Sequence, residues 1–219
     1  MQRKRIATPA FVQITDAPVF RGDGDGPTWL LANRTLMIKW AHPGGDWRDR
    51  DDVARGENHY AIGNADGIGD IAIDVTALVA RLHARNTGMY LRFLAGNAWL
   101  ASKTHATASG PRLHIVTSGG EFDPPCIADT YLSESTSSSL GAEPGMQSPA
   151  LIKFDLSSVS GTVTSATLTL AVTYLYAPCR IAVDYLDCPA LAIANRANGI
   201  EGIAARVAKD KDLANHPSV

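Results

Sequence analysis

The residues best suited to chemistry are aromatic side chains with polar neighbours close in the sequence. Trp47 lies in a loop rich in Pro, Gly and charge, directly between Asp46 and Arg48. The flat C–H faces of sugar rings pack on aromatic rings, and sugar hydroxyls bind carboxylate, guanidinium and amide groups. The pattern therefore predicts a surface that binds sugars, and its candidate residues are Trp40, Asp46, Trp47, Arg48, Tyr60 and Trp99.

Each of these tryptophans also has a structural interpretation. Trp40 and Trp99 fall on expected strands, where a large aromatic side chain commonly fills the core. Trp47 falls in a loop, so a surface role is favoured for it more than for the other two. The amides of Asn58 and Asn97 are close enough in the sequence to supply polar groups at the edge of the expected surface.

Two further carboxylates, Asp23 and Asp25, alternate with glycines in the stretch from Arg21 to Gly26. Hard carboxylate oxygens in such a turn can hold calcium. The stretch lacks the later glutamate of an EF-hand loop, so a solvated turn is the alternative interpretation. Calcium at Asp23 and Asp25 is the one cofactor that the sequence suggests.

The sequence carries no recognisable catalytic motif. It has no G-x-S-x-G elbow, no H-E-x-x-H helix, no phosphate-binding P-loop and no G-x-G-x-x-G turn after a strand. The acids Asp46, Asp49, Asp51 and Asp52 share one polar loop, which is typical of a solvated or calcium-assisted rim rather than of a glycosidase pair. We therefore expect a chain without catalytic activity.

The elements that must position these residues are mainly strands. Residues 151–156 place Ile152, Phe154 and Leu156 on one face, and the polar turn 157–161 follows. Within residues 163–172, Ala166, Leu168, Leu170 and Val172 alternate with Ser165, Thr167, Thr169 and Ala171. This period of two predicts a strand with one face in a core and a threonine row on the other. This pattern is typical of a half-solvated antiparallel sheet.

One short helix interrupts the strands. Residues 69–86 pass from a short strand into a helical pattern, with Asp74 as the expected N-cap and Leu78, Val79 and Leu82 on one face. Further strands are expected within 30–40, 89–94, 99–102 and 111–116. The predicted fold is an all-β antiparallel sandwich with one short helix, followed by a helical segment over residues 191–219.

At two places the chain resembles a known family. Phe154-Asp-Leu-Ser-Ser158, followed by Val163-Thr-Ser-Ala-Thr-Leu168, looks like the central signature of the DNRLRE-type carbohydrate-binding modules, and Ala128-Asp-Thr-Tyr131 resembles their first strand. The resemblance implies a bacterial jelly roll that binds a polysaccharide without catalysis. It also implies attachment to a polysaccharide lyase or another glycan-degrading enzyme, at the cell surface or in secreted form.

The order of the resembling segments is unusual. Within 10–117, five stretches resemble the rear half of such a module: residues 45–47, 74–79, 88–92, 99–103 and 111–115. They precede the signature within 126–188. Residues 1–190 therefore form either one jelly roll from two permuted pieces, or one sandwich followed by an incomplete second copy. The stretches 202–206 and 215–219 resemble the junction before some catalytic domains, which implies an enzyme domain on a longer chain.

Composition excludes other partners. The 219 residues carry 20 basic and 22 acidic side chains and a net charge of −2, so neither a nucleic-acid surface nor a polybasic membrane contact is expected. No apolar run approaches the ~20 residues of a membrane helix, and no signal peptide is visible. Cys179 and Cys188 are either bridged or simply buried. The alternative function is a structural or protein-interaction sandwich of a surface or appendage protein.

Overall fold

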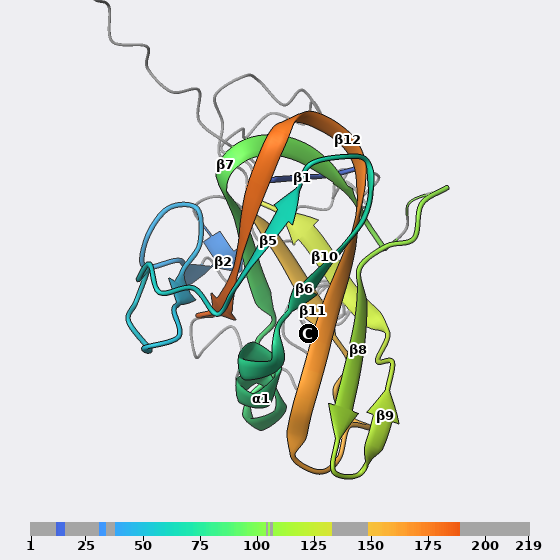
Figure 1. Cartoon of the computed structure of the whole chain (residues 1–219). Helices are drawn as coiled ribbons and strands as arrows, with labels where there is room; N and C mark the ends of the chain where they lie inside the picture. Colours follow the sequence, from blue (N-terminus) through green and yellow to red (C-terminus); the bar gives the residue numbers. More distant parts are fainter. Residues whose placement is uncertain are drawn as a thin grey trace, which may run out of the picture.

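A computed structural model of the chain describes residues 12–15, 31–33, 38–103, 105, 107–132 and 149–188. Within these ranges the regular elements are strands and a single short helix, which confirms the predicted all-β class (Figure 1). Asp23, Asp25 and the expected helical segment 191–219 lie outside the described residues. The elements are β1 (Val12–Thr15), β2 (Leu31–Asn33), β3 (Ile38–Lys39), β4 (Trp47–Arg48), β5 (Ala61–Ala65), β6 (Gly69–Asp74), α1 (Thr76–Ala84), β7 (Met89–Ala101), β8 (Arg112–Thr117), β9 (Gly120–Phe122), β10 (Cys126–Tyr131), β11 (Ala150–Phe154) and β12 (Val163–Leu186).

The main sheet is curled around the 24-residue strand β12. Its order is β10-β11-β7-β12-β8-β9, and β4, β5 and β6 also pair with β12. These pairs are antiparallel, whereas β1 joins β7 in parallel. The strands β2 and β3 form a separate small sheet. The predicted segments 10–117 and 126–188 thus contribute strands to one sheet, because β11 and β12 pair with strands of the first segment.

Strand β12 has two straight parts, which we call its legs, joined by a curved part, which we call the arch. The first leg, residues 163–172, pairs with β6 and β8, and the second leg, residues 179–186, pairs with β5, β7 and β4. Between the legs, β12 and β7 curve together over one end of the molecule (Figure 1). Their pairing is irregular from Val172 to Ile181. Extra residues lie on β12 up to Arg180, and the last extra residue lies on β7, between Ala95 and Phe93. Such bulges bend a strand and increase its twist, which lets one strand serve both sides of the core.

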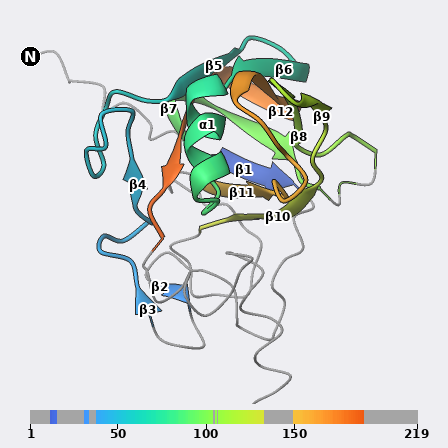
Figure 2. The same ribbon diagram turned by 90° about the horizontal axis from the view of Figure 1, so that it is seen from below.

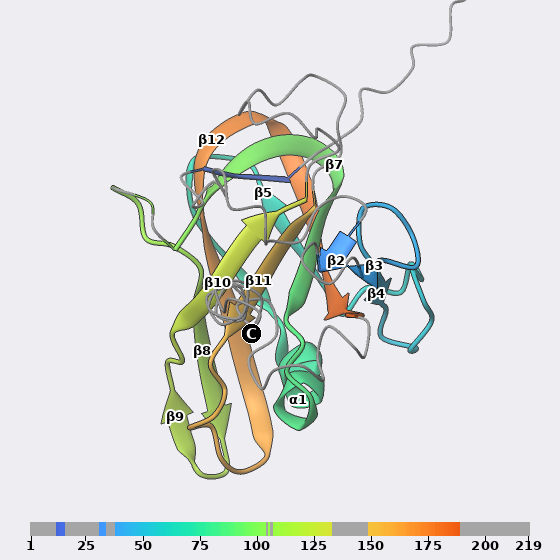
Figure 3. The ribbon, with the colours of Figure 1, turned by 180° about the vertical axis from the view of Figure 1, so that it is seen from behind.

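The first core fills the space between the legs. Ala166, Leu168, Leu170 and Val172 are all buried, as the alternation predicts, and Ile181 and Val183 of the second leg pack in the same cluster. The helix lies at the end opposite the arch (Figures 1 and 3), and Figure 2 views the molecule from that end. The helix buries its three predicted apolar residues, Leu78, Val79 and Leu82.

The start of the helix differs by one residue from the prediction. Val75 is the N-cap, and Asp74 precedes it. The carboxylate of Asp74 accepts hydrogen bonds from Thr76 N at 2.9 Å and from Thr76 Oγ1 at 2.6 Å. Aspartate side chains often bind the backbone two residues ahead, so Asp74 still stabilises this end of the helix without occupying the N-cap.

A second, smaller core lies on the other side of the sheet. Residues 40–58 form a loop beside the end of β12, and they cover buried side chains of β7, β11 and β12. All five residues of β11 are consequently buried, although a half-solvated strand would bury only every second one. The buried members of this cluster are Ala32, Trp40, Trp47, Tyr90, Leu132, Leu151 and Leu186.

Candidate functional site

The described surface exposes one group of aromatic rings, on the arch of β12 and β7. Tyr174 is 48% exposed and Tyr176 is 56% exposed, and Trp99 lies half-buried beside them. The ring centroids of Trp99 are 5.7 Å from Tyr174 and 6.2 Å from Tyr176, and the two tyrosines are 4.6 Å apart. We call Trp99, Tyr174 and Tyr176 the aromatic crest. Of the three, Trp99 is a predicted site residue, and the tyrosines were not.

A bulge in β12 places the tyrosines outside. Val172 pairs with Leu100 and lies in the core, but Tyr174 pairs with Trp99, so Thr173 is an extra residue. Without the bulge, Tyr174 would continue the inward series of Leu168, Leu170 and Val172, since side chains alternate along a strand. The pattern Tyr-x-Tyr at 174–176 is visible in the sequence, but its alternation alone predicts the wrong face.

Unsatisfied polar groups adjoin the crest. Asn97 precedes Trp99 by two residues, on the same outward face of β7. Among the described residues, neither Asn97 Oδ1 nor Trp99 Nε1 has a hydrogen-bond partner, although both atoms are buried. Leaving such groups unpaired costs about 1–3 kcal/mol each, so they are typical of places completed by a ligand or by water. Aromatic faces with an unpaired amide oxygen and an unpaired indole N–H beside them suit a polar ligand that has apolar ring faces.

Trp47 does not lie on the surface, although the sequence favoured a surface role for it. Its side chain is 5% exposed and stacks on Tyr90, with ring centroids 4.9 Å apart and an interplanar angle of 21°. The guanidinium carbons of Arg55 and Arg92 lie 4.5 and 4.7 Å from its ring centroid. Its Nε1 donates to Gly56 O at 3.1 Å. Trp47 is therefore the structural centre of its loop.

Trp40 is likewise 5% exposed and belongs to the second core. The sequence places Trp40 at the end of the strand expected within 30–40. In the structure its ring lies in the same buried cluster as Trp47. Large aromatic side chains gain most of their stabilisation from such burial. In this structure neither Trp40 nor Trp47 presents a ring face on which a sugar can stack.

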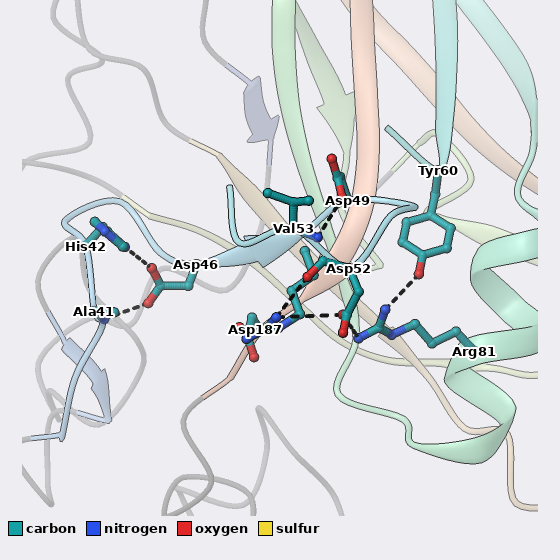
Figure 4. Close-up of polar contacts among 10 residues, drawn as sticks. Ala41, His42, Asp46, Asp49, Asp52, Val53, Tyr60, Arg81 and Asp187 are labelled. Carbon is teal, nitrogen blue, oxygen red and sulfur yellow. Dashed lines mark hydrogen bonds and ion pairs between the residues drawn. The ribbon is translucent and has the colours of Figure 1, made fainter. Parts of the chain in front are cut away.

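The charged neighbours of Trp47 hold the loop together (Figure 4). Asp46 accepts hydrogen bonds from Ala41 N at 2.6 Å and lies 2.7 Å from His42 Nδ1. Arg48 donates from Nε to Asp187 at 2.8 Å and from Nη1 to Asp52 O at 3.0 Å. Asp46 is buried and Arg48 is half-buried, so both serve the local fold and lie apart from the aromatic crest in the sheet register.

Tyr60 and the remaining loop acids are also engaged. The hydroxyl of Tyr60 accepts a hydrogen bond from Arg81 Nη1 at 3.0 Å, and Arg81 Nη2 donates to Asp52 at 2.6 Å (Figure 4). This hydrogen bond holds the pKa of Asp52 below its usual range. Asp49 is buried and accepts backbone hydrogen bonds from residues 51, 53 and 58. The arrangement anchors the loop to α1.

A buried polar pair, His59 and Asp184, was not predicted. Their side chains are 3% and 0% exposed, and His59 Nδ1 lies 2.7 Å from Asp184 Oδ2. Tyr60 N donates to the other carboxylate oxygen at 3.3 Å, and Arg92 Nη2 lies 3.4 Å from His59 Nε2. Burial raises the pKa of Asp184, while His59 opposes that rise. The pair ties residues 59–60 to the second leg of β12.

Metal binding finds no support in the part of the chain that the structure describes. It contains no group of three or more His, Cys, Asp or Glu side chains arranged to hold a metal ion, and Asp23 and Asp25 lie outside it. Cys126, Cys179 and Cys188 are free thiols. Across the described ranges, no helix has the length and apolar character needed to span a membrane.

Comparisons with protein-family models, with curated proteins and with solved structures give no match for this chain.

Proposed function

We propose that this chain is a non-catalytic module that binds a polysaccharide through the aromatic crest and holds an attached enzyme close to that polymer. The observation that carries the proposal is the exposure of Tyr174 and Tyr176, at 48% and 56%, beside the half-buried Trp99. Three neighbouring aromatic rings form a patch, unlike singly scattered exposed residues, and exposed apolar patches are typical of binding sites.

The chemistry of the crest suits sugars. Pyranose C–H faces pack on tyrosine and tryptophan rings, which present large apolar faces together with a polar group. The hydroxyls of the exposed Tyr174 and Tyr176 can exchange hydrogen bonds with sugar hydroxyls. A module of this kind raises the local concentration of an attached enzyme on its polymer, without contributing a catalytic group. The attached enzyme follows from the family resemblance.

A binding screen tests the proposal. Affinity gels with neutral and acidic polysaccharides, with and without calcium, compare the wild type with a Tyr174→Ala/Tyr176→Ala double variant. We expect at least one polymer to retard the wild type, and the double variant to lose at least about tenfold in affinity, since it loses two ring contacts. Ile68→Ala is the matched control, because Ile68 is an apolar residue 72% exposed outside the crest.

Tyr174→Phe/Tyr176→Phe keeps both rings and is expected to retain most of the binding. Equal retardation of the wild type and the alanine double variant, with both folded by circular dichroism, would place the site elsewhere. No retardation by any polymer would contradict the proposed function.

The second candidate function is a structural or protein-interaction domain. The burial of Trp40 and Trp47 favours it, because these two rings serve the fold. The outward face of the first leg also favours it, since that face carries the small polar side chains Ser165, Thr167 and Thr169. A negative glycan screen with a folded protein would shift the conclusion to this function.

A further inference from the structure

The angles between the ring planes of the aromatic crest indicate which physical form of a polysaccharide the crest can bind. Trp99 is inclined by 45° to Tyr174 and by 59° to Tyr176, and the two tyrosines meet edge to face at 63°. Stacking on a flat ligand surface needs rings that lie in a common plane. Within the crest no two rings do so, and a flat surface that lies on one ring therefore meets the others at a steep angle.

The backbone beneath the crest reinforces this geometry. Strand β12 curves over one end of the molecule (Figure 1). Tyr174 and Tyr176 belong to the stretch of β12 whose pairing with β7 is irregular. Bulges bend and twist a strand locally, so consecutive outward side chains do not point the same way. A flat sheet, by contrast, holds alternate side chains in parallel rows, as a planar ligand surface would require.

We propose that the aromatic crest binds a single solvated glycan chain, one sugar ring at a time, and does not adsorb to the flat face of a crystalline polysaccharide. This inference rests on the proposed function. The sugar rings of a single chain in solution are free to rotate about their linkages. They can adopt the orientations of rings inclined by 45° to 63°, whereas rings locked in a crystal face cannot.

The crest is also small. Its three ring centroids lie within 6.2 Å of one another, which is within the range of direct aromatic contact. A site of this size contacts a short piece of glycan, so a short soluble fragment of the bound polymer should occupy it completely. Such a fragment is therefore expected to displace the polymer fully. Extended contact along a crystal face would not be displaced in this way.

The test compares two physical forms of the same polymer. The full chain is incubated with microcrystalline cellulose and with acid-swollen amorphous cellulose, and with crystalline and amorphous chitin, at matched mass. Any soluble polysaccharide that binds in the gel screen is included, with its short oligosaccharides as competitors. The variants are Tyr174→Ala/Tyr176→Ala, Tyr174→Phe/Tyr176→Phe and the control Ile68→Ala.

We expect at least tenfold more protein to bind an amorphous or soluble form than a crystalline form. The alanine double variant should lose that binding. A short oligosaccharide should displace the wild type from the polymer completely. Equal or stronger binding to a crystalline form, lost in the alanine variant, would overturn the inference while leaving the proposed function intact. Binding that persists unchanged in the alanine variant would overturn it too. If the wild type binds no form of any polymer, that result contradicts the proposed function and the inference together.

Discussion

Trp99 and Tyr174 face each other across the ladder between β7 and β12, with ring centroids 5.7 Å apart. They meet because Thr173 is bulged, which turns Tyr174 away from the core that its neighbour Val172 enters. The same stretch of β12 thus bends the sheet and exposes its aromatic residues. The fold and the candidate site share one structural cause, and changes that straighten the arch should affect both.

The arch depends on a close approach between β7 and β12 at Gly96. Gly96 has a φ of +69°, and a Cβ there would lie 2.0 Å from Pro178 O and 2.6 Å from Cys179 Cα. We expect Gly96→Ala to lower the free energy of unfolding by more than about 2 kcal/mol, since both strain and backbone overlap oppose it. Urea denaturation followed by circular dichroism measures the change.

The control for that substitution is Gly67→Ala, because nothing lies within 4 Å of a Cβ at Gly67. It should change the free energy of unfolding by less than about 1 kcal/mol in either direction. Similar values for Gly96→Ala and Gly67→Ala would show that the strands do not approach closely at Gly96.

The buried pair of His59 and Asp184 should contribute strongly to stability. Asp184→Ala leaves the buried His59 ring and Tyr60 N without their carboxylate partner, and we expect a loss of about 3 kcal/mol in the free energy of unfolding. Asp187→Ala, which removes the partly exposed ion pair with Arg48, should cost no more than about 1 kcal/mol. Chemical denaturation of both variants at neutral pH would reveal this contrast, and equal losses would contradict it.

The stability contributed by Asp52 should depend on pH. Hydrogen bonding from Arg81 lowers the pKa of Asp52 in the folded state, whereas the unfolded value is about 3.9. The contribution is therefore fully present above the unfolded pKa, and it disappears as the pH falls through the lower folded pKa. The stability difference between wild type and Asp52→Asn should be larger near about pH 6 than near about pH 2. A difference that grows toward acid in denaturation experiments would contradict this sign.

Substitution of Trp47 should affect the stability of the protein but not its affinity for a polysaccharide. Trp47→Ala removes a buried ring that stacks on Tyr90, and we expect it to cost about 3–5 kcal/mol in the free energy of unfolding. The affinity of the remaining folded protein for a polysaccharide should stay within about twofold of the wild type, a change of less than about 0.5 kcal/mol. Calorimetric titration below the unfolding transition measures it. A folded Trp47→Ala variant without binding would place the site on the loop.

Local sequence patterns were sufficient for much of the fold. The alternation over residues 163–172 predicted which side chains of β12 enter the core, and Ala166, Leu168 and Leu170 are buried accordingly. The three apolar positions of α1 were predicted for the same reason. Both patterns are short in range, since a strand repeats every two residues and a helix every 3.6. A period that holds within one element can be recognised without knowing what packs against it.

Contacts between distant residues were decided only by the tertiary structure. His59 and Asp184 are 125 residues apart in the chain, and no local sequence pattern around either residue identifies its partner. Trp47 belongs to a polar loop in the sequence but to a core in space, because that loop folds over a sheet face which local periodicity treats as solvated. Tyr174 and Tyr176 continue an inward series in the sequence, and one bulged residue places them outside. A bulge shifts the alternation of every residue after it until the next irregularity, so the tertiary pairing alone determined which aromatic residues reach the surface.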